Sequence, residues 1–147
     1  MTIEEMDLAP VAKKAATILL EKHPKIQFTS GRRTVTQQAH AMAGNVVKNR
    51  KWIGQTYIAA AKLQQWVDAN PQAKTVAAIT AGLEKTMNEM PQTALLKISR
   101  HLVGKAFDVR PVTANAAKIK ADIRALPGLH KFLEKEGGLI RWHAQFT

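Results

Sequence analysis

The order of its expected elements predicts that this chain is an α+β protein, with a small, mostly antiparallel sheet flanked by helices. Short segments typical of strands alternate with longer segments in which apolar residues recur every three or four positions. The chain has 147 residues, of which 46% are hydrophobic, so it is long enough and apolar enough to form a proper core. No internal repeat or low-complexity tract is visible, and we therefore expect a single domain over residues 1–147.

The N-terminal part of the chain predicts a helix followed by a strand. Apolar residues at spacings of three and four predict an amphipathic helix over Asp7–Glu21. Pro24 disfavours helical geometry in the residue before it, so this helix is expected to end at His23. Residues Ile26–Thr29 are then expected to form a strand.

The middle of the chain is expected to be mostly helical. The pattern Thr34-x-x-Gln37 is typical of a capping box and predicts a helix from about Val35 to Lys48. Further helical faces follow, and Pro71 fits the first position of one of these helices. We interpret residues 45–95 as a helical elaboration that covers one side of a functional site formed elsewhere in the chain.

The C-terminal part of the chain predicts two strands and two helices. A short strand is expected over Lys105–Val109, and a helix is expected from a cap at Thr113 to about Ala125. Leu129–Glu136 is expected to be a short helix that is stopped by Gly137-Gly138. Leu139–Phe146 is expected to be the final strand.

The chain is strongly basic. It carries 22 Lys and Arg residues and 11 Asp and Glu residues, which give a formal net charge of +11. Such a charge favours an anionic polymer or surface, such as nucleic acid, teichoic acid, lipopolysaccharide or peptidoglycan carboxylates, and does not choose among them. Aromatic residues make up only 5% of the chain, so stacking platforms for single-stranded nucleic acid are scarce.

One short segment brings chemically active residues together. On the expected strand, alternation turns Ala106 and Asp108 to one face and the apolar residues to the other. Gly104 allows the chain to turn, so that His101 can come back beside Asp108. The chain has no cysteine, so a metal site must use His, Asp or Glu. One nitrogen and one oxygen ligand suit zinc if a third ligand arrives from elsewhere, and His143 is the best candidate.

The final strand is expected to offer this third ligand on a suitable face. Alternation places Leu139, Arg141 and His143 on one face and Ile140 and Trp142 on the other. His143 is therefore expected to be a ligand next to an aromatic residue of the core.

The spacing Ser99-x-His101-x-x-Gly-x-Ala-x-Asp108, followed by Trp142-His143, resembles a known family of zinc peptidases. These are the D-Ala-D-Ala carboxypeptidases and L-alanyl-D-glutamate endopeptidases, which share a fold with the hedgehog signalling domain and act on bacterial cell-wall peptides. The resemblance implies a hedgehog-like fold, with zinc held by His101, Asp108 and His143. It also implies a zinc metallopeptidase in which metal-activated water hydrolyses a stem-peptide bond of peptidoglycan, as in a phage endolysin or an antibacterial effector.

Two further residues acquire expected roles from this resemblance. The segment Phe28–Thr34 resembles the Ser-Gly-x-Arg segment that precedes the zinc motif in the family. There, the arginine corresponding to Arg33 helps to hold the carboxylate of the substrate peptide, a task that suits the guanidinium fork. A surface arginine is the alternative reading. Ser99 is expected to bond locally, to orient the loop at His101 and to be a substrate-binding residue.

The general base is the point at which the resemblance departs from the family pattern. Many members place an acidic residue three positions before the last histidine, where this chain has Ile140. Glu136 is the nearest carboxylate and is the first candidate for the base, with Glu134 next. The alternative is that both glutamates lie on the solvent side of a short charged helix. His40, on the helix after Arg33, is the second choice.

The leading hypothesis is therefore a zinc peptidase, which we expect to be a monomer. A non-catalytic wall-binding or structural module of the same fold is the second hypothesis. A basic nucleic-acid-binding protein ranks last, because only the charge favours it and no specific nucleic-acid motif is present. No signal peptide and no transmembrane segment are visible. The enzyme is thus expected to be made in the cytoplasm and to act in the periplasm or at the cell wall after its release.

Overall fold

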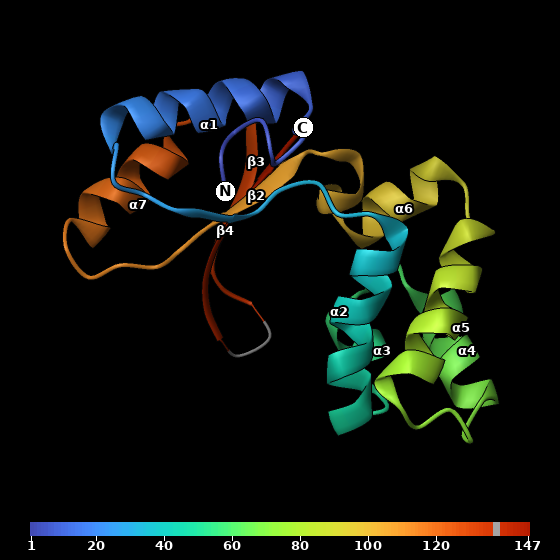
Figure 1. Cartoon of the computed structure of the whole chain (residues 1–147). Helices are drawn as coiled ribbons and strands as arrows, with labels where there is room; N and C mark the ends of the chain where they lie inside the picture. The colour runs from blue at the N-terminus through green and yellow to red at the C-terminus, as the bar shows by residue number, and fades with distance from the viewer. Residues whose placement is uncertain (137–138) are drawn as a thin grey trace. The chain divides into compact units, whose positions relative to one another are not determined.

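The computed structural model describes residues 1–136 and 139–147, apart from the side chain of Glu136. The chain divides into two compact units, one made of Met1–Arg32 and Val103–Thr147 and the other of Arg33–Leu102 (Figure 1). Each unit has its own hydrophobic core. The single domain expected over residues 1–147 stays a prediction.

The first unit contains a four-stranded antiparallel sheet within the described residues. Its strands are β1 (Phe28–Ser30), β2 (Ala106–Val109), β3 (Leu129–Glu136) and β4 (Leu139–Phe146). Their order across the sheet is β1-β2-β4-β3, and each neighbouring pair is antiparallel. The predicted α+β class with an antiparallel sheet is confirmed, and β4 has the bounds expected for the final strand.

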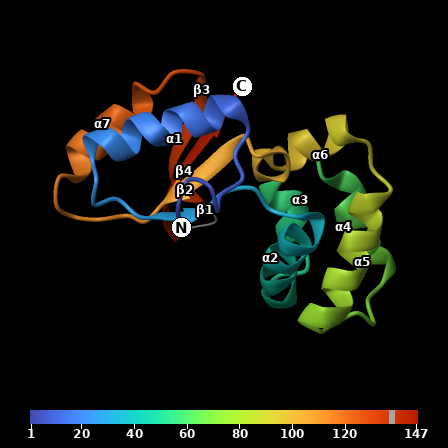
Figure 2. The same ribbon diagram turned by 45° about the horizontal axis from the view of Figure 1, so that its top comes forward.

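Helices α1 (Pro10–Lys22) and α7 (Ala116–Arg124) pack on one face of this sheet (Figures 1 and 2). Phe107 and Val109 of β2 turn toward these helices and are buried, as the alternation predicted. The buried core of this unit comprises Met6, Leu8, Ala12, Ala15, Ala16, Leu19, Phe28, Phe107, Val109, Ile119, Ile123, Leu126, Trp142, Ala144 and Phe146. Removal of these apolar side chains from water is the main force that holds the helices on the sheet.

Two helices begin later than expected because a residue shortly before each has a left-handed backbone. Asp7 has a φ of 48°, and α1 begins only at Pro10, whose ring favours the first helical position. Asn115 has a φ of 59°, so α7 begins at Ala116 rather than directly after a cap at Thr113.

Residues Leu129–Glu136 form strand β3, so the prediction of a short helix there is wrong. Leucine, lysine and glutamate are good helix formers, but an isolated helix of this length is marginal in water. The segment instead pairs along β4, with Leu133 opposite His143. Pairing with a neighbouring strand thus overrides the local preference. Gly137-Gly138, which we expected to stop the helix, lies outside the described residues.

The pairing of β3 with β4 is irregular at two places, between Leu129 and Lys131 and between Leu133 and Lys135. Leu133 faces His143, whereas Lys135 faces Ile140, so β4 holds one residue more than β3 between these two pairs. Such an extra residue interrupts the alternation of side chains. The predicted alternation of side chains between the two faces of β4 therefore applies from Trp142 onward. It does not apply to the residues of β4 before Trp142.

The second unit is helical and extends beyond the predicted elaboration at residues 45–95. It consists of α2 (Val35–Lys48), α3 (Trp52–Thr56), α4 (Ala61–Ala69), α5 (Val76–Asn88) and α6 (Gln92–Ile98). The predicted capping box of Thr34 and Gln37 is present, and α2 has the predicted bounds. Buried residues of α2 belong to the core of this unit, which is why the unit begins at Arg33. A short 3-10 helix, η1 (Arg100–Val103), follows α6.

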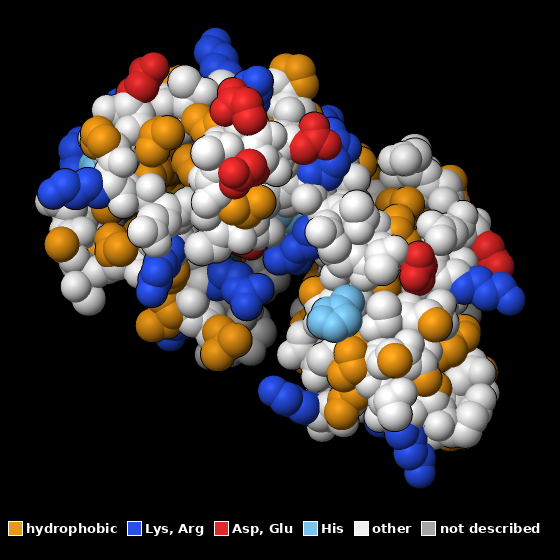
Figure 3. All heavy atoms as spheres, in the orientation of Figure 1, with side chains coloured by type: hydrophobic (Ala, Val, Ile, Leu, Met, Phe, Trp, Pro, Cys, Tyr) orange, Lys and Arg blue, Asp and Glu red, His pale blue; other side chains and the backbone are white. Residues whose placement is uncertain are grey.

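The described residues include no helix long and apolar enough to cross a membrane. On the face shown in Figure 3, basic side chains are spread over both units and do not gather in a single patch. The formal charge of +11 belongs to the whole chain, and on this face its basic side chains lie apart from one another.

Candidate metal centre

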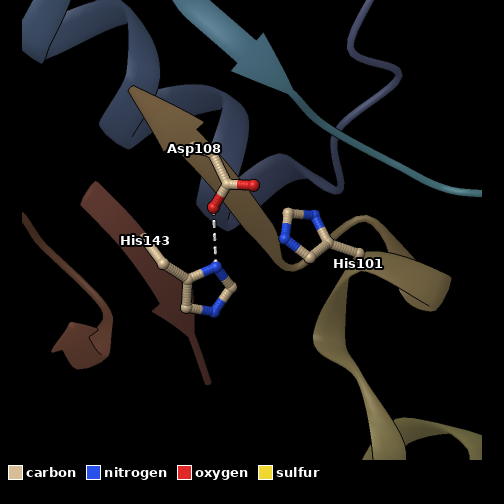
Figure 4. Close-up of side chains that lie close together, drawn as sticks. All are labelled: His101, Asp108 and His143. Atoms are coloured by element: carbon tan, nitrogen blue, oxygen red, sulfur yellow. Dashed lines mark hydrogen bonds and ion pairs between the residues drawn. The ribbon is translucent and has the colours of Figure 1, made fainter. Parts of the chain in front are cut away.

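Asp108 and His143 are brought together by the register of two neighbouring strands. The two residues face each other directly in the antiparallel pair of β2 and β4. Residues in such a position point to the same face of the sheet, with their Cβ atoms about 5 Å apart. Oδ1 of Asp108 lies 2.8 Å from Nδ1 of His143 (Figure 4). This face is opposite to the one that packs against α1 and α7, as the alternation of Phe107 and Asp108 requires.

His101 reaches the same place from η1, through a turn that depends on glycine. Gly104 has a φ of +71°, a conformation that costs little only for a residue without a side chain. Its carbonyl accepts a hydrogen bond of 2.9 Å from the backbone N–H of Ala9. The backbone N–H of His101 donates to Oγ of Ser99 at 3.3 Å. Ser99 thus bonds locally and orients the turn at His101, as expected.

The side chains of His101, Asp108 and His143 converge into one group (Figure 4). Each residue offers one ligand atom, and these atoms lie within 4.8 Å of one another. The three residues are only 3%, 3% and 6% exposed, respectively. Two imidazole nitrogens and one carboxylate oxygen are a donor set that suits zinc and related divalent metals. The three predicted ligands therefore form a buried group that can hold a metal ion.

Arg33, the expected substrate-binding residue, is tied to the backbone of a predicted ligand. Its backbone N–H donates to the carbonyl of His101 at 2.9 Å. Arg33 is half-buried, and its Nη1 lies 3.4 Å from Oε1 of Gln38. Arg32, in contrast, is exposed and directs its guanidinium to Asp7, with Nε 3.0 Å from the carboxylate. The role of Arg33 as the substrate-binding arginine stays a prediction.

The candidate bases fall into different environments. His40 is exposed on α2 and is not among the residues whose ligand atoms converge. Glu136 closes β3, and its side chain lies outside the described part of the chain. Glu134 accepts hydrogen bonds from Lys120, at 2.8 Å, and from Arg124.

These hydrogen bonds make Glu134 a poor base. The bond from Lys120 is the main reason that the pKa of Glu134 lies below its usual value, and the bond from Arg124 acts in the same direction. A general base works best when its pKa is near the operating pH, so a lowered pKa weakens it. Glu136 and His40 remain as the candidates.

Gln145 was not predicted from the sequence as part of the site, and its Oε1 lies 3.0 Å from Nε2 of His143. The signal that reveals it is the period of two in a strand, because residues 143 and 145 of β4 share one face.

Comparisons of this chain with models of protein families, with curated proteins and with solved structures found no match.

Proposed function

We propose that this chain is a zinc-dependent peptidoglycan peptidase with a hedgehog-like fold, acting as a phage endolysin or an antibacterial effector. One observation carries the proposal: the two ends of the resembling motif, far apart in sequence, supply a single buried group of His101, Asp108 and His143. A motif that had arisen by chance would have no reason to place these three side chains together. Burial of a carboxylate beside two imidazoles is costly unless the charges are compensated, and a bound cation compensates them.

The chemistry follows from this donor set. When bound, zinc supplies a water of lowered pKa as the nucleophile and polarises the carbonyl of the scissile bond. His101, Asp108 and His143 would hold the cation, each with one ligand atom, and all three residues are buried. A structural zinc site usually has four protein ligands, whereas three ligands are typical of a catalytic site. The described residues include three candidate ligands in this group, and this number favours a catalytic site over a structural one.

Arg33 is the proposed anchor for the substrate. Because its backbone donates to the carbonyl of His101, its position is coupled to that of a ligand. The stem peptides of peptidoglycan carry carboxylates, which a guanidinium binds well through two parallel hydrogen bonds. The diffuse positive charge of the chain favours the approach to such an anionic polymer.

Glu136 is the proposed general base, with His40 as the second choice. Glu136 ends the strand that pairs with β4, at the same end of the sheet as Ile140, which stands in the place of the family's acid. A base that takes a proton from the nucleophile and gives it to the leaving amine contributes about 10²–10⁴-fold to the rate.

A non-catalytic zinc-containing module that binds the cell wall is the alternative, and the exposed Ile140 favours it. This side chain is 69% exposed and has no group able to transfer a proton. In this alternative the metal group maintains the fold, and the purified protein binds peptidoglycan without cleaving it.

Release of peptides from purified peptidoglycan distinguishes the two functions. The zinc-loaded protein should release new amino termini, and the release should stop with a chelator and return when zinc is added. His101→Ala should abolish the release. His130→Ala should retain it, because His130 is an exposed histidine on β3 and is not part of the buried group. Zinc-dependent binding with no released amino termini would favour the module over the peptidase.

A further inference from the structure

Both ring nitrogens of His143 have partners, and both partners are acceptors. Nδ1 lies 2.8 Å from Oδ1 of Asp108, and Nε2 lies 3.0 Å from Oε1 of Gln145. A neutral imidazole carries a proton on one nitrogen and a lone pair on the other. The nitrogen that keeps the proton therefore decides which nitrogen can bind a metal.

The fold holds Gln145 firmly at this position. β4 is an inner strand of the sheet, and Gln145 faces Ala106 on β2 and Lys131 on β3. The next residue, Phe146, is fully buried and donates its backbone N–H to Lys105 at 2.8 Å. Strands on both sides therefore fix the backbone from which the Gln145 side chain extends.

The small side chain of Ala106 leaves room for this amide. Ala106 and Asp108 lie two residues apart on β2, opposite Gln145 and His143, respectively. The four side chains therefore form two facing pairs on one face of the sheet. Ala106 is fully buried, so a larger residue there would compete with Gln145 for the same space.

We propose that Gln145 is a positioning residue that keeps the proton of His143 on Nε2, so that Nδ1 presents its lone pair to the metal beside Asp108. This inference rests on the proposed function, because it assigns a role toward the proposed metal. The amide oxygen accepts the Nε2–H bond and also blocks the approach of a cation to this nitrogen. A hydrogen bond to the non-ligating nitrogen fixes the ring and typically contributes about 10–100-fold to metal affinity.

The wild-type protein provides the first test. Long-range ¹H–¹⁵N correlation spectra of the zinc-loaded protein should show a proton on Nε2 of His143 and none on Nδ1. A spectrum with the proton on Nδ1 would overturn the inference. This measurement does not depend on any variant folding correctly.

Variants of Gln145 provide the second test. Gln145→Met keeps the length of the side chain but removes the acceptor, and it should raise the Kd for Zn²⁺ about 10–100-fold. Gln145→Glu retains an acceptor and should keep the Kd within a few-fold of the wild-type value. Gln72→Met, on an exposed residue of the second unit, is the control for loss of an amide. An unchanged Kd in a folded Gln145→Met protein would overturn the inference.

The two tests separate this inference from the proposed function. If the wild-type protein binds zinc and cleaves peptidoglycan while Gln145→Met binds zinc equally well, only the role of Gln145 fails. If the wild-type protein binds zinc with the predicted proton position but cleaves nothing, the peptidase fails and the role of Gln145 stands. A wild-type protein that binds no zinc would overturn both.

Discussion

Nε2 of His23 lies 2.7 Å from Oδ2 of Asp122, which joins the C-terminal end of α1 to α7. Both side chains are about nine-tenths buried, and Lys118 adds a second contact to the carboxylate at 3.1 Å. This pair lies among the helices that cover the sheet and shares no residue with the proposed metal centre. It offers a test of the first unit that is independent of the metal.

Acid should weaken the first unit through Asp122. The hydrogen bond from His23 is the main reason that the pKa of Asp122 lies below its usual value, and the bond from Lys118 acts in the same direction. A carboxyl group whose pKa is lowered in the folded state stabilises the fold above its unfolded pKa of about 3.9. This contribution is lost as the pH falls toward the folded pKa.

The Tm of wild type and of Asp122→Asn, measured across pH, tests this assignment. The difference in Tm should shrink as the pH falls below about 4. Glu21→Gln, which removes an exposed negative charge from α1, is the control and should show a much smaller difference. A difference for Asp122→Asn that is the same at acidic and neutral pH would contradict the role of the pair.

Gly104→Ala should destabilise the fold and weaken metal binding together. A Cβ atom there would lie 2.8 Å from the guanidinium of Arg32 and 2.9 Å from the backbone nitrogen of Ala9. Together with the positive φ, this should cost about 1–3 kcal/mol in the free energy of unfolding. Because the turn sets the position of His101, the Kd for Zn²⁺ should also rise.

Gly44→Ala is the matched control. A Cβ atom at Gly44 meets nothing within 4 Å, and the residue lies inside α2. This change should stabilise the protein by about 0.5–1 kcal/mol, because alanine favours a helix over glycine. Denaturant unfolding curves of both variants test the pair. Equal stability of Gly104→Ala and wild type would show that the turn does not need glycine.

Arg50 should be a major support of the second unit. Its guanidinium donates to the carbonyls of Val67 and Asn70, at 2.9 and 3.0 Å, and to that of Ala73. A lysine has no planar fork and cannot reproduce three such bonds. Arg50→Lys should therefore lower the free energy of unfolding by about 1.5–3 kcal/mol.

The neighbouring Lys51→Met tests whether this effect is specific to the guanidinium. Lys51 pairs with Asp68 at 3.0 Å, but both side chains are largely exposed, and such pairs contribute less than about 1 kcal/mol. Chemical denaturation should rank the Arg50 variant well below the Lys51 variant. The reverse order would contradict the structural role of Arg50.

Glu136→Gln should separate catalysis from metal binding. If Glu136 is the base, this change should lower the rate of peptidoglycan hydrolysis about 10²–10⁴-fold and leave the zinc content unchanged. Glu134→Gln, two residues earlier on β3, should retain activity because Lys120 and Arg124 already bind that carboxylate. Loss of activity in His40→Gln but not in Glu136→Gln would move the role of base to His40.

The strand patterns and the local turn signals predicted most of the candidate site. Alternation in β2 correctly predicted that Asp108 points away from the core. The glycine at position 104 correctly predicted the turn that brings His101 back beside Asp108. The capping box of Thr34 and Gln37 fixed the start of α2. These features depend on residues within a few positions of one another, which is why the sequence reveals them.

Features that depend on residues far apart in the chain were harder to predict from the sequence. Strand β3 is rich in helix formers and becomes a strand only because β4 pairs with it. The extra residue in β4 between Ile140 and His143 arises from the register of two strands, and no local pattern marks it. The contact of Gln145 with His143 follows simple alternation, but its significance appears only once the direction of each ring nitrogen is known.

Titration of the purified protein with Zn²⁺ tests the metal centre most directly. The wild-type chain should bind one zinc ion, and each of His101→Ala, Asp108→Ala and His143→Ala should lose this binding while His130→Ala retains it. Zinc affinity that is absent from the wild-type protein, or that is unaffected by all three substitutions, would contradict the proposal that these residues form a metal centre.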